Sequence, residues 1–290
     1  MVTLGRTALL HCLLFSAILA LIVLVSSMWL PQGGDGDCGP AHFPCGTYRK
    51  TPQPPLAEPD RAPPLIRECP GQSFQASRLL RFLTSSLSVA DDVLLEPYLQ
   101  SWDQLITFME SLGPVVSFFS QKVKEKLELL RRLAGTPGPK GAVRRGAVDA
   151  YRSVRSMAEV EIRAGVVDFT QRTDSGCRTL LRLHRSLLWL AMTLDGLTHA
   201  PDRHGRLKTP GELSSDAYQV ALAPHHPWVL RQAAELVFLA LPDREYFLRL
   251  VCAQNQPEAE PVLRVISRAL EKVHGATQRI LEEHAMLDLP

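Results

Sequence analysis

Asparagine is almost absent from this chain of 290 residues, because it occurs once, at Asn255, before Gln256 and Pro257. No Asn-x-Ser/Thr acceptor exists, which excludes N-glycosylation. The chain also lacks an excess of either charge, since 32 Lys and Arg against 30 Asp and Glu leave a net charge of +2. Such a balance provides no long-range field for nucleic acid, so we expect no nucleic-acid partner.

Sequence motifs of catalysis are lacking as well. The chain contains no His-Glu-x-x-His, no Cys-x-x-Cys and no Gly-x-Ser-x-Gly. The adjacent His225 and His226 are weak evidence for a metal, because neither a thiol nor a carboxylate accompanies them. We therefore expect a protein that is not an enzyme and that uses no cofactor and no metal.

Charged residues are missing from residues 7–30, a stretch of 24 positions. A bilayer core needs about 20 apolar helical residues, so this segment is long enough to span one. The only flanking positive charge is Arg6, which favours a cytoplasmic N-terminus. Residues 1–30 are interpreted as a retained signal-anchor helix or as a cleaved signal peptide. Either reading makes the chain membrane-associated or part of the secretory pathway.

Residues 31–71 differ from both neighbours, because ten prolines lie between Pro31 and Pro70. Proline removes backbone donors and disfavours helix in the preceding residue, which predicts a disordered Pro-rich stalk. Cys38, Cys45 and Cys69 lie in this segment with spacings that fit no zinc signature. They can pair in an oxidising compartment, or they can remain free thiols.

Residues 72–290 show apolar residues at helical spacing and no alternating pattern, which predicts an all-α domain. Asp91 and Asp92 are expected to cap the second helix, and Pro227 is expected at a first helical position. The expected helices number about nine and lie near 79–87, 94–109, 115–133, 146–165, 177–197, 214–224, 227–241, 243–252 and 259–285.

The most informative segment carries Arg178, Arg182 and Arg185, which stand at i, i+4 and i+7 on one helical face. Three guanidinium groups in a row repel one another unless an anion lies against them. Arginine matches phosphate oxygens in bidentate geometry, so the row predicts a phosphate clamp, with a solvated basic face as the alternative. Lys126 and His226 are two further candidates, although each also fits an ordinary surface lysine or a structural histidine.

Taken together, these segments resemble the glycolipid transfer protein superfamily. The resemblance covers about 72–290, and the hydrophobic N-terminus and the stalk lie outside it. The family's fold is a two-layer helical sandwich, in which lipid chains enter a dry pocket between the layers and the headgroup rests in a surface site. The matching stretches occur in the family's order: Leu94–Trp102, Gly176–Arg185, Asp216–Leu222, His226–Trp228 and Leu287–Pro290.

The resemblance assigns roles to individual residues. Arg178 and Arg182 fall on the two arginines that grip a lipid phosphate, and Lys126 falls on the lysine that joins them. Arg172 and Arg185 fall on accessory basic positions. A further position, His226, falls on the histidine that donates to the lipid's amide carbonyl.

One position departs from the resemblance. Lys122 stands where the family has an aspartate that accepts from the amide N–H and hydroxyl of the sphingoid base. An ammonium group has no acceptor, so it cannot replace those bonds. Glu125 is three residues further on, and its direction from the helix differs. We therefore expect an intact phosphate-binding half and an altered amide-binding half.

The expected function is non-enzymatic transfer of a phosphorylated sphingolipid between membranes by a monomer that docks on the membrane surface. The expected ligand is ceramide 1-phosphate or a related anionic lipid. A membrane-tethered lipid sensor or interaction protein without transfer activity is the alternative. The N-terminal segment places the domain in the secretory pathway, whereas the resemblance alone favours the cytosol.

Overall fold

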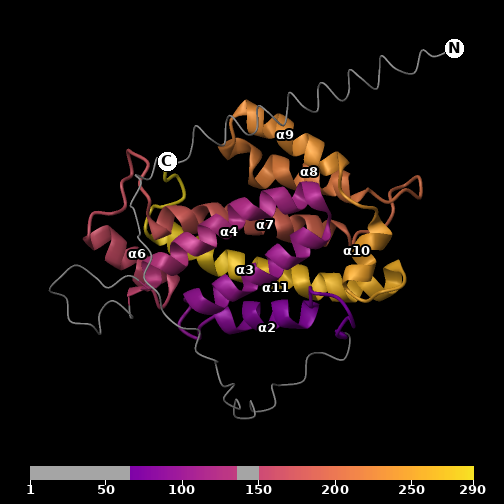
Figure 1. Ribbon diagram of the computed structural model, residues 1–290, viewed down its shortest axis with the longest axis horizontal. Coiled ribbons are helices and arrows are strands. Elements are labelled where there is room, and N and C mark those ends of the chain that lie inside the picture. Colours follow the sequence, from indigo (N-terminus) through magenta and orange to yellow (C-terminus); the bar gives the residue numbers. More distant parts are fainter. Residues whose placement is uncertain (1–65, 136–149) are drawn as a thin grey trace, which may run out of the picture. The chain divides into compact units, whose positions relative to one another are not determined.

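The computed structural model describes residues 66–135 and 150–290, and this part of the chain is all-helical (Figure 1). The only β-type pairings in it are two isolated bridges, Leu87 with Val93 and Leu94 with Ser153. The helices are α2 Ala76–Ser86, α3 Leu95–Ser111, α4 Pro114–Gly135, α6 Val154–Arg163, α7 Gly176–Gly196, α8 Pro210–Ala221, the 3₁₀ helix η1 Ala223–His225, α9 Trp228–Leu239, α10 Arg244–Leu250 and α11 Gln256–Glu283.

The all-α prediction is confirmed, and several helix starts follow from capping residues. The side chain of Ser175 accepts from the Arg178 amide at the start of α7, and Asn255 caps α11 in the same way. Thr209 forms a reciprocal capping box with Glu212 at the start of α8. Each cap satisfies an amide that the helix itself leaves without a partner.

Two of the expected caps are wrong. The second helix begins at Leu95 after Leu94, which offers no side-chain cap, whereas Asp92 accepts from the amides of Val93 and Arg155. Asp91 has a positive φ of 57° and pairs with Arg279 of α11. Pro227 is the residue before α9 and not its first helical residue. The acidic pair therefore joins distant segments, which local sequence does not reveal.

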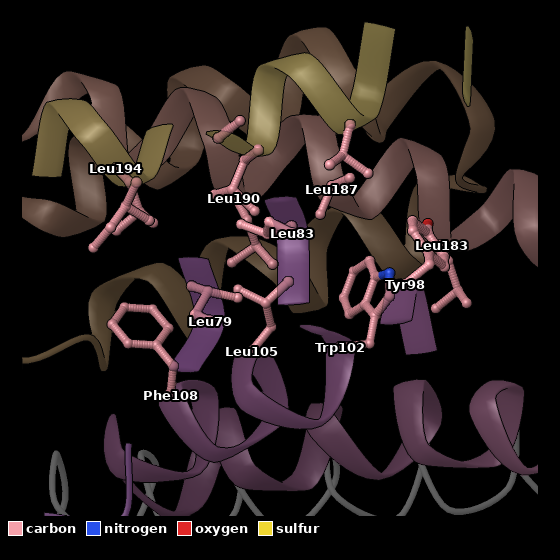
Figure 2. Close-up of a cluster of buried hydrophobic side chains, with 14 of the residues drawn as sticks. Leu79, Leu83, Tyr98, Trp102, Leu105, Phe108, Leu183, Leu187, Leu190 and Leu194 are labelled. Carbon is pink, nitrogen blue, oxygen red and sulfur yellow. The ribbon is translucent and has the colours of Figure 1, made fainter. Parts of the chain in front are cut away.

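The helices form two groups whose apolar faces meet, one of α2, α3 and α4 and the other of α6, α7, α8 and α11. α2 packs on α3 and α3 packs on α4, while α7 packs against α4, α6, α8 and α11. Figure 2 shows leucines of α7 pointing toward side chains of α2 and α3, all of them buried. This shared core holds Leu79, Leu83, Tyr98, Trp102, Leu105, Phe108, Leu183, Leu187, Leu190 and Leu194.

The packed chain includes residues that were expected in the stalk. Ile66 is 7% exposed and Cys69 is 1% exposed, and Cys69 forms a disulfide with Cys252, between α10 and α11. The amide side chain of Gln75 bonds the backbone of Cys69 on both its N–H and its carbonyl, at 2.8 Å each. Cys38 and Cys45 lie outside the described residues, as do residues 7–30. Within the described ranges, no helix is sufficiently long and apolar to cross a bilayer.

A buried carboxylate holds the start of α7. Glu161 of α6 is 2% exposed, and its oxygens accept from the amides of Gly176 at 2.7 Å and Cys177 at 2.9 Å. The Tyr151 hydroxyl donates to the same carboxylate at 2.7 Å. A negative charge is favourable at a helix N-terminus, because the first amides lack partners within the helix. The position of α7, and hence of its arginines, depends on this contact.

We expect Glu161→Gln to lower the free energy of unfolding by about 1–3 kcal/mol, because the amide replaces a charged acceptor of three buried hydrogen bonds. Denaturant unfolding measures the change. Glu159→Gln is the matched control, since Glu159 is exposed on the same helix and pairs with Arg163. Equal effects of the two substitutions would contradict the role assigned to Glu161.

Candidate functional site

The helix α7 divides its residues between the core and a basic face. Leu180, Leu183 and Leu187 are fully buried, whereas Arg178, Arg182 and Arg185 are half-buried on the other side. The period of 3.6 residues per turn produces this division. The row of arginines expected from the sequence is therefore present, and α7 links it directly to the core.

Lys126 of α4 lies next to this row. Burial, followed by the charge of Arg182, lowers the pKa of Lys126 to about 8. Its ammonium group donates to the carbonyl of Lys122 at 2.9 Å, one turn earlier in α4. The contact between α4 and α7 places this lysine within electrostatic range of Arg182.

Arg182 is at the centre of the cluster. Burial, followed by the charges of Arg178, Arg172 and Arg185, lowers its pKa to about 10. The exposed carboxylate of Asp174 raises the pKa of Arg182 and so opposes this effect. A partly buried guanidinium group surrounded by like charges is a place where an anion is stabilised.

His226 approaches the cluster from the connection between η1 and α9. Burial, followed by the charges of His225, Lys126, Arg185 and Arg182, lowers the pKa of His226 to about 4, so the ring is neutral at pH 7. Its Nδ1 lies 2.8 Å from the Tyr218 hydroxyl. Burial raises the pKa of that hydroxyl to about 12. When Tyr218 donates to Nδ1, the ring proton is on Nε2, which becomes a hydrogen-bond donor.

The C-terminal segment completes the surroundings of the arginines, and sequence reasoning assigned it no contacts. The guanidinium of Arg178 donates to the carbonyls of Pro290 and Thr173, and Arg185 donates to the carbonyl of Leu287 at 2.6 Å. Asp288 partly offsets the lowering of the Arg185 pKa by burial. No local sequence signal reveals these contacts, because backbone carbonyls are present in every residue.

Lys122 has a partner on its own helix. Its ammonium group bonds both carboxylate oxygens of Glu125, at 2.9 and 3.1 Å, and the side chains are 46% and 60% exposed. Lys122 also contributes to the low pKa of Lys126. Glu125 is the nearest carboxylate along α4 after Lys122, and in the structure both of its oxygens accept from Lys122.

Two cavities of about 300 and 260 Å³ lie beside α3 and do not include residues of α7. The larger is lined by ion pairs of α3 with α4, among them Asp103 with Arg131 at 2.6 Å. The space between the two helix groups is filled by their own side chains, so the expected chain pocket is closed in this structure. Residues 66–135 and 150–290 contain no cluster of three potential metal ligands.

The fold and the site define a class: a two-group helical domain with a cluster of basic side chains at the edge of its core. The sequence model of the glycolipid transfer protein family matches residues 93–253. The human ceramide-1-phosphate transfer protein is 38% identical over 223 residues, covering 75% of this chain and 97% of that protein. The zebrafish (Danio rerio) protein of the same name is 35% identical, covering 75% and 99%. The chain belongs to the glycolipid transfer protein family.

Solved structures agree with this assignment. The human ceramide-1-phosphate transfer protein in complex with 2:0 ceramide-1-phosphate has a TM-score of 0.66 at 36% identity, covering 73% of this chain and 97% of that one. The fungal glycolipid transfer protein HET-C2 has a TM-score of 0.54 at 18% identity, covering 69% and 92%. The second likeness shows the shared fold alone.

We expect Lys126→Met to stabilise the unliganded protein at pH 7. The pKa of Lys126 is about 8 in the folded chain and about 10.5 when unfolded, so protonation favours the unfolded state. The gain in the free energy of unfolding is complete below pH 8 and disappears as the pH rises toward 10.5. Denaturant unfolding at pH 7 and pH 10 measures it.

Lys124→Met is the matched control, because Lys124 is on the same helix and pairs with Glu110 at 2.5 Å. We expect no gain from this substitution. A gain of equal size and pH dependence in both variants would show that general charge reduction, and not the environment of Lys126, is responsible.

Proposed function

We propose that the chain binds a phosphorylated sphingolipid, first of all ceramide 1-phosphate, and transfers it between membranes without bond chemistry. The observation that carries this proposal is the convergence of Lys126, Arg178 and Arg182 from two helices. Burial lowers the pKa of all three groups, and a phosphate dianion would reverse that effect. The names of the relatives that are 35–38% identical support the choice of lipid.

Individual roles follow from position. Lys126, Arg178 and Arg182 would bind the phosphate oxygens, with Arg172 and Arg185 as accessory cations. Each charge-assisted hydrogen bond is worth about 1.5–3 kcal/mol. His226 would donate from Nε2 to the carbonyl that follows the headgroup, since Tyr218 occupies Nδ1. Arg178 and Arg185 would exchange their backbone carbonyl partners for phosphate oxygens.

A carrier of this kind acts through solvation. Each methylene group is worth about 0.8 kcal/mol, so a chain of sixteen carbons resists leaving a bilayer by roughly 12 kcal/mol. A protein docked on the membrane lowers that barrier by receiving the chain between its two helix groups. These groups would have to separate, because their side chains fill the space between them.

The membrane surface would contact α9. Trp228 is 67% exposed at the first turn of this helix and lies two residues after His226. Val229, Leu230 and Leu239 are also exposed. Exposed apolar side chains and an indole ring suit the interface between water and lipid. A lipid would then enter the site beside the helix that touches the membrane.

The secretory pathway is the location that we propose for the domain, with a cytosolic domain as the alternative. The Cys69–Cys252 disulfide supports this placement, because such bonds persist in oxidising compartments and are rare in the cytosol. Protease protection of the full chain in intact microsomes tests it. Digestion of the domain without detergent would favour the cytosol.

A second candidate is a tethered protein that binds an anionic lipid headgroup and does not extract the chains. The closed packing between the helix groups favours it. The two functions differ in one measurable step, which is the removal of lipid from a vesicle.

We expect Arg182→Leu to weaken ceramide 1-phosphate binding at least tenfold, because the variant loses a charge-assisted contact. Lipid captured from vesicles and quantified by mass spectrometry measures this. Arg264→Leu is the control, since Arg264 pairs with Glu260 on the exposed face of α11. Wild-type capture by a folded Arg182→Leu variant would exclude the proposed phosphate site.

We expect Trp228→Ala to slow transfer between vesicles several-fold while affinity for micellar lipid stays unchanged, because the indole contacts the membrane and not the headgroup. Fluorescent lipid transfer and micelle binding measure the two quantities. Val89→Ala is the control, since Val89 is fully exposed in the α2–α3 connection. Binding without any transfer by the parent chain would favour the tethered sensor.

A further inference from the structure

The headgroup site, which comprises Lys126, Arg178, Arg182, Arg185 and His226, offers side-chain donors almost exclusively. Ammonium and guanidinium groups have no acceptor atoms. The neutral ring of His226 offers Nε2–H when Tyr218 donates to Nδ1. The side chains of this site therefore fit a ligand that presents acceptors, while the backbone oxygens at the site, those of Thr173, Leu287 and Pro290, accept from Arg178 and Arg185.

The carboxylates near the headgroup site leave the donor character of its side chains unchanged. The carboxylate of Glu125 raises the pKa of Lys126. The ammonium group of Lys122 binds both oxygens of that carboxylate. Asp174 raises the pKa of Arg182, and Asp288 raises the pKa of Arg185, so both carboxylates belong to the phosphate side of the site. Both side chains are exposed. Lys122 thus removes an acceptor from the α4 side and adds positive charge next to Lys126.

The excess of hydrogen-bond donors in the site discriminates between an amide-linked and an ester-linked lipid chain. An amide and an ester both present a carbonyl that can accept from His226. An amide also carries an N–H, and a sphingoid base carries a hydroxyl, and both need an acceptor once water is excluded. A buried donor left without a partner costs about 1–3 kcal/mol. Ester linkages to glycerol carry no donor, so they avoid that cost.

We propose that this chain accepts a glycerol-based phosphomonoester with two ester-linked chains, phosphatidic acid, at least as well as ceramide 1-phosphate. The proposal rests on the proposed lipid-binding function and specifies its ligand class. Lys122, through its pair with Glu125, is the residue that determines this selectivity. The sphingolipid amide is consequently tolerated by the site and not required by it.

The test is competitive capture by the full chain. The chain is immobilised and incubated with detergent micelles that contain equal amounts of the two lipids with matched chain lengths. Bound lipid is quantified by mass spectrometry. We expect a ratio of phosphatidic acid to ceramide 1-phosphate of one or more. A reproducible preference for ceramide 1-phosphate overturns the proposal, whereas capture of neither lipid overturns the proposed function itself.

Lys122→Asp provides the complementary arm. Restoring an acceptor on this exposed face of α4 should shift the ratio about tenfold toward ceramide 1-phosphate. Lys124→Asp is the matched control on the same helix and should leave the ratio unchanged. An unchanged ratio in a folded Lys122→Asp variant, shown by circular dichroism, overturns the role of Lys122.

Two further arms separate the remaining explanations. Glu125→Ala, which removes both acceptor oxygens, should leave ceramide 1-phosphate capture unchanged, and a loss would show that Glu125 supplies the missing acceptor, which overturns the proposal. Glycerol 3-phosphate in excess should displace little lipid. Complete displacement would show that the site recognises a free phosphomonoester and not a lipid.

Discussion

The packing of α7 is the constraint on which the rest of the structure depends. One side of this helix supplies leucines to the core shared by α2, α3 and α11, and the other side carries the arginine row. Glu161 fixes its first turn by accepting from two amides. The basic groups therefore cannot move apart without disturbing the core, and their mutual repulsion is maintained by the fold.

This repulsion connects stability with ligand binding. Lys126, Arg182 and His226 each have a pKa below the ordinary value, because burial and neighbouring positive charges disfavour a further proton. An anion that binds only the folded chain removes this penalty and stabilises the fold by mass action. The backbone carbonyl of Leu287 satisfies a hydrogen bond of Arg185 but, being uncharged, does not neutralise it.

Much of the helical pattern was predictable, because apolar periodicity is local. The sequence predicted a helix over 177–197, and α7 is Gly176–Gly196. Spacing alone put the arginines in one row, whereas only the family resemblance placed Lys126 with them. Contacts between distant segments were not predictable. Cys69 bonds a residue 183 positions away, Asp91 pairs with Arg279, and Glu161 caps a helix other than its own. Each depends on the folded arrangement, which composition and spacing do not encode locally.

The disulfide has a mechanical consequence. Cys69 precedes α2 in the chain, and Cys252 lies between α10 and α11. Tension applied to the chain on the N-terminal side of Cys69 passes through the sulfur–sulfur bond into that connection, in addition to the backbone that leads to α2. The load therefore divides between the start of α2 and the α10–α11 connection, and it does not peel α2 away from α3 as a first step.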